Sequence, residues 1–143
     1  MKKQADRIKR FLRLLFRHHR ALVYALGVLV RVRLMLAFKS YRDVLKWSDT
    51  LSSSSPLRSI PVPVAVWSIK HAARLVPGAL CLAQALSLRH LLMLAGEQCT
   101  VRIGASMKDD GKFAAHAWVL YQGRCIIGGT EEHVGKFSRL VDL

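Results

Sequence analysis

Acidic residues and long apolar runs are both scarce in this chain. Of its 143 residues only 9 are Asp or Glu, against 23 Lys or Arg, so the formal net charge is +14. The longest uninterrupted apolar run, from Ala21 to Val30, has ten residues, whereas about twenty are needed to cross a bilayer. We therefore expect no membrane span, although contact with a membrane surface stays open. The basic start also lacks a compact apolar segment with a small-residue cleavage site, so no secretory signal is predicted.

Cysteines are also few, and their spacing argues against a metal site or a disulfide framework. The three cysteines, Cys81, Cys99 and Cys125, are odd in number and form no CxxC pair. We expect no metal and no cofactor. A reduced, cytoplasmic location fits this pattern best. The length is that of one domain with a single core and room for an appendage.

The positive charge is concentrated in the N-terminal third of the chain. Residues 1–48 contain 13 Lys or Arg against 2 Asp or Glu, a net of +11, and the remaining 95 residues have a net of +3. Apolar residues at helical spacing predict helix over residues 5–47, with a bend or a division into two helices because Gly27 and Arg33 interrupt the pattern. We divide the chain into a basic helical segment (1–50), a Ser/Pro-rich linker (51–63) and a core (64–143).

The predicted core begins with helices and ends with strands. Helical patterns cover residues 64–76 and 80–94, and Gly96 is placed to end the second helix. Alternating patterns and turn signals predict three strands joined by tight turns, with the strands at 98–105, 114–121 and 124–127 and the turns at 108–112 and 122–123. Helices followed by antiparallel strands indicate the α+β class.

Two residues of this core point to chemistry. Cys81 follows Pro77-Gly78 and opens an Ala/Leu-rich run, so we expect it in the first turn of a buried helix. The unpaired N–H groups of a helix N-terminus lower the pKa of a thiol and can hold an oxyanion. His116 lies between small residues in a predicted strand and could supply the base. A lone cysteine on an apolar helix is more often a small core residue, so the combination with His116 carries the argument.

Longer motifs extend this pattern into a family resemblance. The motifs are Cys81-Leu82-Ala83-Gln84-Ala85-Leu86, Leu91-Leu92 through Gly96, Val101-Arg102-Ile103-Gly104, Ala115-His116-Ala117-Trp118-Val119 and Gly123-Arg124-Cys125-Ile126-Ile127-Gly128-Gly129. Over roughly residues 64–135 the chain resembles the lasso-peptide leader peptidases, a transglutaminase-like cysteine protease family that includes the protease of microcin J25 maturation. The resemblance implies a papain/transglutaminase-like core, with the catalytic cysteine at a helix N-terminus that packs on a small antiparallel sheet. It also implies an endopeptidase that removes the leader of a ribosomally made lasso precursor. A separate ATP-dependent, asparagine-synthetase-like cyclase would then close the macrolactam ring.

The third catalytic residue that this family leads us to expect is absent from its usual place. Family members commonly have an aspartate about a dozen residues after the histidine, where this chain has Gly128-Gly129. No carboxylate occurs between Gly111 and Gly129. Glu131 and Glu132 are the next carboxylates, and Glu131 is the preferred candidate to orient His116, with a backbone carbonyl or a water as further alternatives.

The basic N-terminal segment raises the question of partners. Single-chain members of the resembling family carry a winged-helix domain that binds the leader, and residues 1–50 are too short and too poor in strands for it. The resemblance therefore implies a split form that needs a separate leader-recognition protein. The basic face of Arg10, Arg13, Arg17 and Arg20 is a candidate dock for that protein, the leader or the cyclase.

Two other interpretations of the basic segment stay open at this point. The arginines could form the solvated face of a packing helix, or they could contact a membrane surface. Nucleic acid is not expected, because aromatic residues are not concentrated among the charges. The alternative to an enzyme is a non-catalytic basic adaptor that binds an acidic partner or a membrane surface, in which Cys81 is only a core residue.

Overall fold

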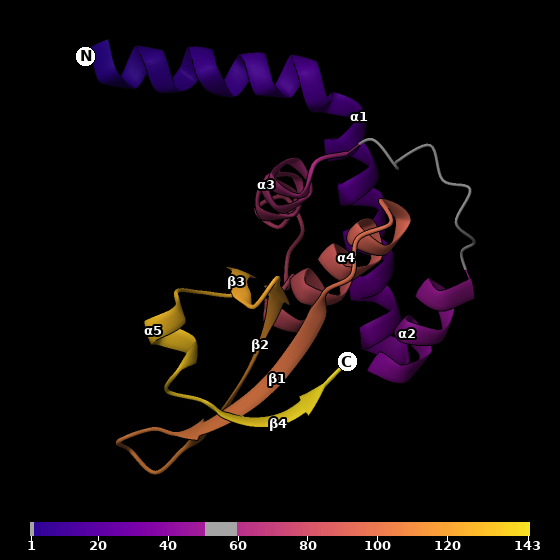
Figure 1. Cartoon of the computed structure of the whole chain (residues 1–143), viewed down its shortest axis with the longest axis vertical. Coiled ribbons are helices and arrows are strands. Elements are labelled where there is room, and N and C mark those ends of the chain that lie inside the picture. Colours follow the sequence, from indigo (N-terminus) through magenta and orange to yellow (C-terminus); the bar gives the residue numbers. More distant parts are fainter. Residues whose placement is uncertain (1, 51–59) are drawn as a thin grey trace.

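Helices precede a small antiparallel sheet in this fold, which a computed structural model describes for residues 2–50 and 60–143 (Figure 1). The α+β class predicted from the sequence is confirmed. The elements are, in chain order, α1 (Lys2–Phe38), α2 (Tyr41–Thr50), α3 (Val62–Ala72), α4 (Cys81–Leu94), β1 (Thr100–Met107), β2 (Phe113–Tyr121), β3 (Arg124–Ile127), α5 (Glu131–Val134) and β4 (Ser138–Asp142).

The N-terminal helical segment is bent and then divided, as the sequence indicated. The bend lies at His18, whose φ of −121° and ψ of 22° are not helical, and not at Gly27. α1 ends at Phe38, and α2 begins after Ser40. There the Ser40 hydroxyl and backbone N–H both donate to the Asp43 carboxylate at 3.0 Å. These side-chain contacts satisfy donors that a helix start leaves free, which explains why a new helix begins at this point.

The ends of α3 and α4 follow from local chemistry. α3 starts at Val62, two residues earlier than predicted, because Pro61 is its N-cap and Pro63 sits in the first turn, where proline loses no hydrogen bond. α4 runs from Cys81 to Leu94 and ends at Gly96, which has a φ of +80°. The N–H groups of Gly96 and Glu97 donate to the carbonyls of Met93 and Leu92. This is the Schellman pattern, and the predicted stop at Gly96 is confirmed.

The sheet has the strand order β3-β2-β1-β4. Turns at residues 108–112 and 122–123 join β1 to β2 and β2 to β3, as predicted. Gln122 and Gly123 have φ values of +50° and +77°, which two-residue hairpins of this hand require. α5 and β4 were not predicted from the sequence. β4 pairs with β1 and not with its neighbours in the chain, so its partner could not be found from local pattern.

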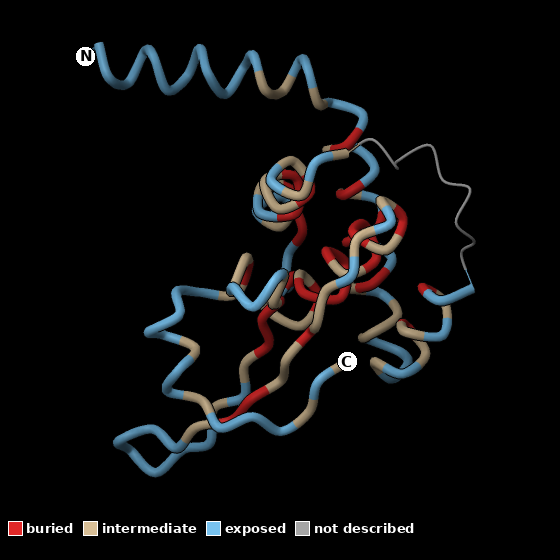
Figure 2. Tube along the Cα trace, in the orientation of Figure 1, coloured by how far each residue is buried: buried red, intermediate tan, exposed pale blue. Residues whose placement is uncertain are grey.

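The hydrophobic core lies between the helices and one face of the sheet (Figure 2). It includes Leu29 and Val32 of α1 and Val44 of α2, each at most 1% exposed, together with Val101 and Val119 of the sheet. Fully burying a side chain of this size contributes about 1.5–3 kcal/mol. The core therefore draws on both sides of the predicted linker. Residues 51–59 of that linker lie outside the described part of the chain.

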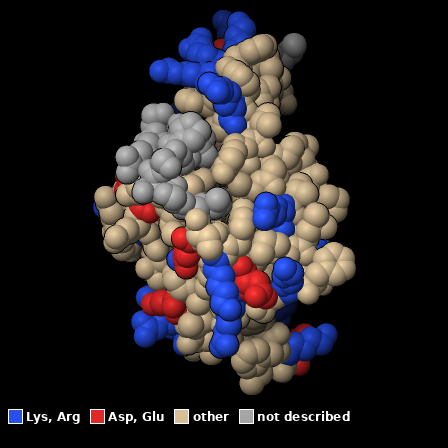
Figure 3. Space-filling model, turned by 90° about the vertical axis from the view of Figure 1, so that its right-hand side faces the viewer, with Lys and Arg blue, Asp and Glu red and all other residues tan. Residues whose placement is uncertain are grey.

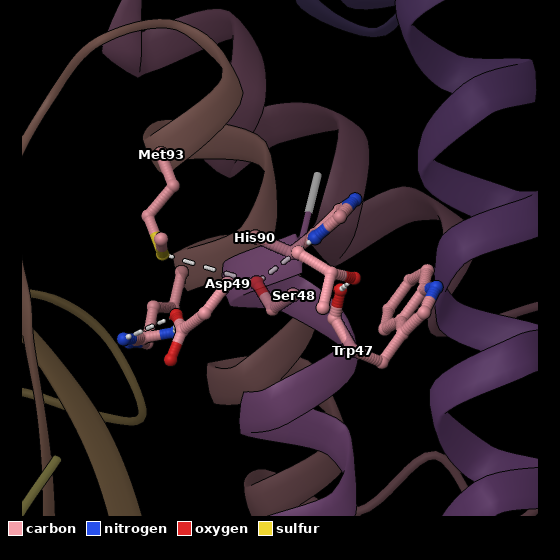
Figure 4. Close-up of polar contacts among 7 residues, drawn as sticks. Trp47, Ser48, Asp49, His90 and Met93 are labelled. Atoms are coloured by element: carbon pink, nitrogen blue, oxygen red, sulfur yellow. Dashed lines mark hydrogen bonds and ion pairs between the residues drawn. The ribbon is translucent and has the colours of Figure 1, made fainter. Parts of the chain in front are cut away.

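One buried histidine joins α2 to α4 (Figure 4). The Nδ1 of His90 lies 3.0 Å from the Ser48 hydroxyl, and the His90 ring stacks on Trp47 at 4.5 Å between centroids. The Ser48 hydroxyl donates to the Met93 sulfur at 3.8 Å, so it accepts from Nδ1–H. The His90 Nε2 is buried without a hydrogen-bond partner among the described residues. Burial, with Arg31 and Arg89 nearby, lowers the pKa of His90 to about 4.

Candidate active site

Cys81 is the first residue of α4 and carries a free, half-buried thiol. The residue before it, Leu80, is the N-cap and makes no side-chain hydrogen bond to the helix. The first backbone N–H groups of α4 therefore lack a capping side chain and remain available to an oxyanion. Gln84 lies one helical turn after Leu80, and its side chain points back toward the helix start, where its amide donates to the Ala79 carbonyl at 2.7 Å.

The chain approaches Cys81 through a turn that only glycine fits. Gly78 has a φ of +71°, and a Cβ at this position would lie 2.8 Å from the Arg33 Nε. The guanidinium of Arg33 thus reaches from α1 and packs on the turn that precedes α4. This position explains why an arginine interrupts the apolar side of α1 in the sequence.

The other two cysteines are poorly suited to act as nucleophiles. Burial raises the pKa of Cys99 to about 11. Burial also raises the pKa of Cys125, whose thiol donates to the carbonyls of Ile127 and Gly129 at 3.4 Å. Because the thiolate is the reactive form, both environments oppose catalysis by these residues.

His116 lies in the middle of β2 and is held by the main chain of a later segment. Its Nε2 is hydrogen-bonded to the carbonyl oxygen of Gly128. A carbonyl only accepts, so Nε2 carries the proton and the neutral ring has its lone pair on Nδ1. An imidazole in this tautomer can take a proton at Nδ1. Its ring is also packed against Trp118, His133 and Phe137, at centroid distances of 5.2–6.0 Å.

Gly128 occupies the sequence position where the resembling family commonly has an aspartate. Its φ is +103°, and a Cβ there would lie 2.5 Å from the Cβ of Trp118. A side chain is therefore excluded, and the backbone carbonyl takes the place beside the imidazole. This was one of the alternatives that the sequence left open.

Glu131 is the first residue of α5 and is exposed. Among the described residues the hydrogen bond of His116 goes to Gly128 and not to Glu131. His133 of the same helix packs against His116, with the two rings edge to face at 5.4 Å between centroids. His133 and Phe137 were not predicted to lie beside His116, since nothing in their local sequence pattern indicates a neighbour in β2.

Cys81 and His116 come from elements in contact, α4 and β2, but the structure does not join them. No hydrogen bond links their side chains in the described ranges. Ala117 and Val119 of β2 face the core, so His116 and Trp118 alternate to the other side of the strand. β3 pairs only with Val119–Tyr121, which leaves the edge of β2 beside His116 free of β3. The Cys81–His116 pair therefore stays a prediction.

The predicted partner-binding residues Arg10, Arg13, Arg17 and Arg20 are all exposed on α1. α1 is also long enough and apolar enough to cross a membrane by length and composition alone. The expectation that no helix spans a membrane was based on the length of uninterrupted apolar runs, and Arg31 and Arg33 interrupt the apolar sequence of α1. The structure packs 28% of the most apolar stretch of α1 inside the protein.

The match to a known family agrees with this fold of helices followed by a small sheet. A family model described as the transglutaminase-like superfamily matches residues 25–142, so the chain belongs to that superfamily. Its members are generally cysteine proteases or transferases. The match includes Cys81 and His116 and begins within α1, ahead of the predicted linker. Searches of curated proteins and of solved structures gave no significant match to this chain.

Proposed function

We propose that this chain is a cysteine endopeptidase that removes the leader from a ribosomally made lasso precursor. The observation that carries the proposal is the hydrogen bond from His116 Nε2 to the Gly128 carbonyl, which leaves Nδ1 free as a base. Membership of the transglutaminase-like superfamily supports cysteine chemistry. The choice of a lasso precursor rests on the sequence resemblance alone.

In the first half of the proposed reaction, Cys81 attacks the scissile carbonyl and His116 takes the thiol proton. The tetrahedral oxyanion is held by N–H groups in the first turn of α4, which no side chain caps. Collapse of this intermediate breaks the C–N bond. His116 then returns the proton to the leaving amine, which becomes the new N-terminus of the core peptide.

In the second half, water hydrolyses the thioester that joins the leader to Cys81. His116 accepts a proton from the attacking water, and the Cys81 thiolate leaves as the leader carboxylate forms. The Gly128 carbonyl keeps Nε2 protonated and the ring oriented throughout. The mechanism requires Cys81 to reach Nδ1 when substrate binds, and this needs a rearrangement of α4 or β2, because His116 lies on the face of its strand away from the core on which Cys81 packs.

The proposal includes partner proteins and a cytoplasmic setting. A separate recognition protein captures the leader, and a separate ATP-dependent cyclase consumes the freed amine. The three cysteines are free thiols, which suits a reducing compartment. Slow cleavage by the chain alone, restored by the recognition protein, is the expected behaviour of such a split system.

The deciding experiment compares variants with the precursor encoded beside this chain's gene, in the presence of the recognition protein. We expect Cys81→Ala and His116→Ala each to lower cleavage by at least about a thousandfold. Cys125→Ala is the matched control and should retain activity. Product formation is followed by mass spectrometry. Normal turnover by Cys81→Ala, with loss in Cys99→Ala or Cys125→Ala, would show that the nucleophile was wrongly assigned.

Alkylation separates the enzyme from the non-catalytic adaptor. Iodoacetamide at neutral pH should modify Cys81 selectively, and His116→Ala should change the pH dependence of that reaction. Equal, slow modification of all three cysteines would favour a structural role for Cys81.

A further inference from the structure

The first part of α1, which we name the N-terminal arm, extends beyond the body of the protein (Figure 1). It comprises residues 2–17, ahead of the bend at His18. Nearly all of it is exposed (Figure 2). One side of the arm rests on α3, where the Phe11 ring lies 6.1 Å from Trp67 and 5.3 Å from His71. Ile8 and Arg10 border a hollow between the arm and α3 and are nevertheless exposed, and the surface of the arm beyond this hollow is open.

The open surface has an apolar side. Ile8, Leu12 and Phe16 follow one another at intervals of four residues and so lie on one face of the helix. Their exposed fractions are 56%, 44% and 79%. Three large apolar side chains in a row are more than the scattered exposure that soluble surfaces normally show.

A basic side adjoins this apolar row. Arg10, Arg13 and Arg17 are spaced by three and four residues, which places them together on a second face of the arm, and Arg20 follows just beyond the bend at His18. Residues 2–17 contain 7 Lys or Arg against the single acid Asp6. Figure 3 shows the Lys and Arg side chains gathered over the arm beside an uncharged surface.

This combination matches the chemistry of an anionic lipid surface. A helix lying in the membrane interface buries apolar side chains below the headgroups while its basic side chains meet the phosphates. An acidic protein would satisfy the arginines but would also have to supply an apolar groove for Ile8, Leu12 and Phe16. We infer that the N-terminal arm holds this protein on the surface of an anionic membrane. This inference is independent of the proposed peptidase activity.

The test uses the full chain and extruded vesicles of phosphatidylcholine, with and without 30 mol% phosphatidylglycerol. At 50 mM NaCl we expect cosedimentation with the anionic vesicles only. Neutralising arginines to glutamine should weaken partitioning about fivefold for each residue, and 500 mM NaCl should remove most of the binding. Leu12→Ser with Phe16→Ser should weaken it at least about tenfold, since each burial is lost.

Phe38→Ser is the matched control, because Phe38 is 84% exposed at the other end of the same helix. It should bind as the wild type does, and circular dichroism should show the same helix content for all variants. Absence of binding to anionic vesicles at low salt would overturn the inference. Equal losses of binding in Phe38→Ser and in the variant that combines Leu12→Ser with Phe16→Ser would overturn it as well. Arginine-dependent binding of the purified recognition protein, without any vesicle binding, would instead assign the face to an acidic protein.

Discussion

Protonation of His90 should make the fold acid-sensitive. The side chain is 1% exposed, and its pKa is lowered to about 4, first by burial and then by repulsion from Arg31 and Arg89. Charging the ring would place a cation between Trp47 and the core, with the second ring nitrogen unpartnered. The unfolded chain has no such constraint, and its histidine titrates near a pKa of about 6.5.

The size and sign of the effect follow from these two pKa values. Above pH 6.5 both states are neutral at this position, and His90 contributes no pH dependence. As pH falls below 6.5, the unfolded state gains a proton that the folded state does not take up, so the folded state loses relative stability. The loss is about 2 kcal/mol at pH 5 and about 3 kcal/mol near pH 4, below which it levels off.

Denaturant unfolding at pH 7.5 and pH 5.0 measures this linkage. His90→Leu removes the titrating group at similar volume, so the difference between wild type and variant isolates His90 from all other groups. His19→Leu changes an exposed histidine and should leave the wild-type slope intact. If the free energy of unfolding falls between pH 7.5 and pH 5.0 by the same amount in wild type and His90→Leu, within about 0.5 kcal/mol, the reasoning is refuted. If His90→Leu does not fold, an NMR titration of wild type should find His90 neutral at pH 5.

Two further predictions concern the surroundings of His116. Glu131→Gln should change the cleavage rate less than about threefold, because the Gly128 carbonyl already holds Nε2; a large fall in kcat at unchanged KM would return the orienting role to Glu131. Gly128→Ala should destabilise the protein by about 2–4 kcal/mol, because a Cβ would lie 2.5 Å from Trp118 at a φ of +103°. Gly123→Ala is the control, because Gly123 has a φ of +77° but nothing lies within 4 Å of a Cβ built there. This variant should lose only about 1 kcal/mol of stability in thermal or denaturant unfolding. Similar losses of stability in both variants would contradict the packing argument.

The features that sequence predicts well here are local ones. The start of α4 at Cys81, its end at Gly96 and the turn at 122–123 depend on residues that carry their own conformational preference. The bend of α1 was expected, but its location at His18 was not, since no proline or glycine marks it.

The features that sequence could not supply are contacts between distant segments. β4 forms because β1 offers an edge, and α5 is too short for a periodic signal. The hydrogen-bond partner of His116 is a main-chain carbonyl oxygen, which every residue type carries and which the sequence therefore does not mark. A search restricted to side chains could only lead to Glu131, the nearest carboxylate of the segment that follows.

The Gly128 carbonyl beside His116 has a consequence for how such proteins are recognised. A main-chain acceptor carries no charge, does not titrate and survives every side-chain substitution that leaves the backbone in place. Under the proposed mechanism, substitution of polar side chains would therefore identify only Cys81 and His116, and a pattern that demands an acid after the histidine would reject this chain. A residue other than glycine could replace Gly128 only if the backbone left the φ of +103° and Trp118 moved away. In the proposed mechanism, the residue whose carbonyl orients His116 is recognised by a glycine at positive φ and not by an acidic side chain.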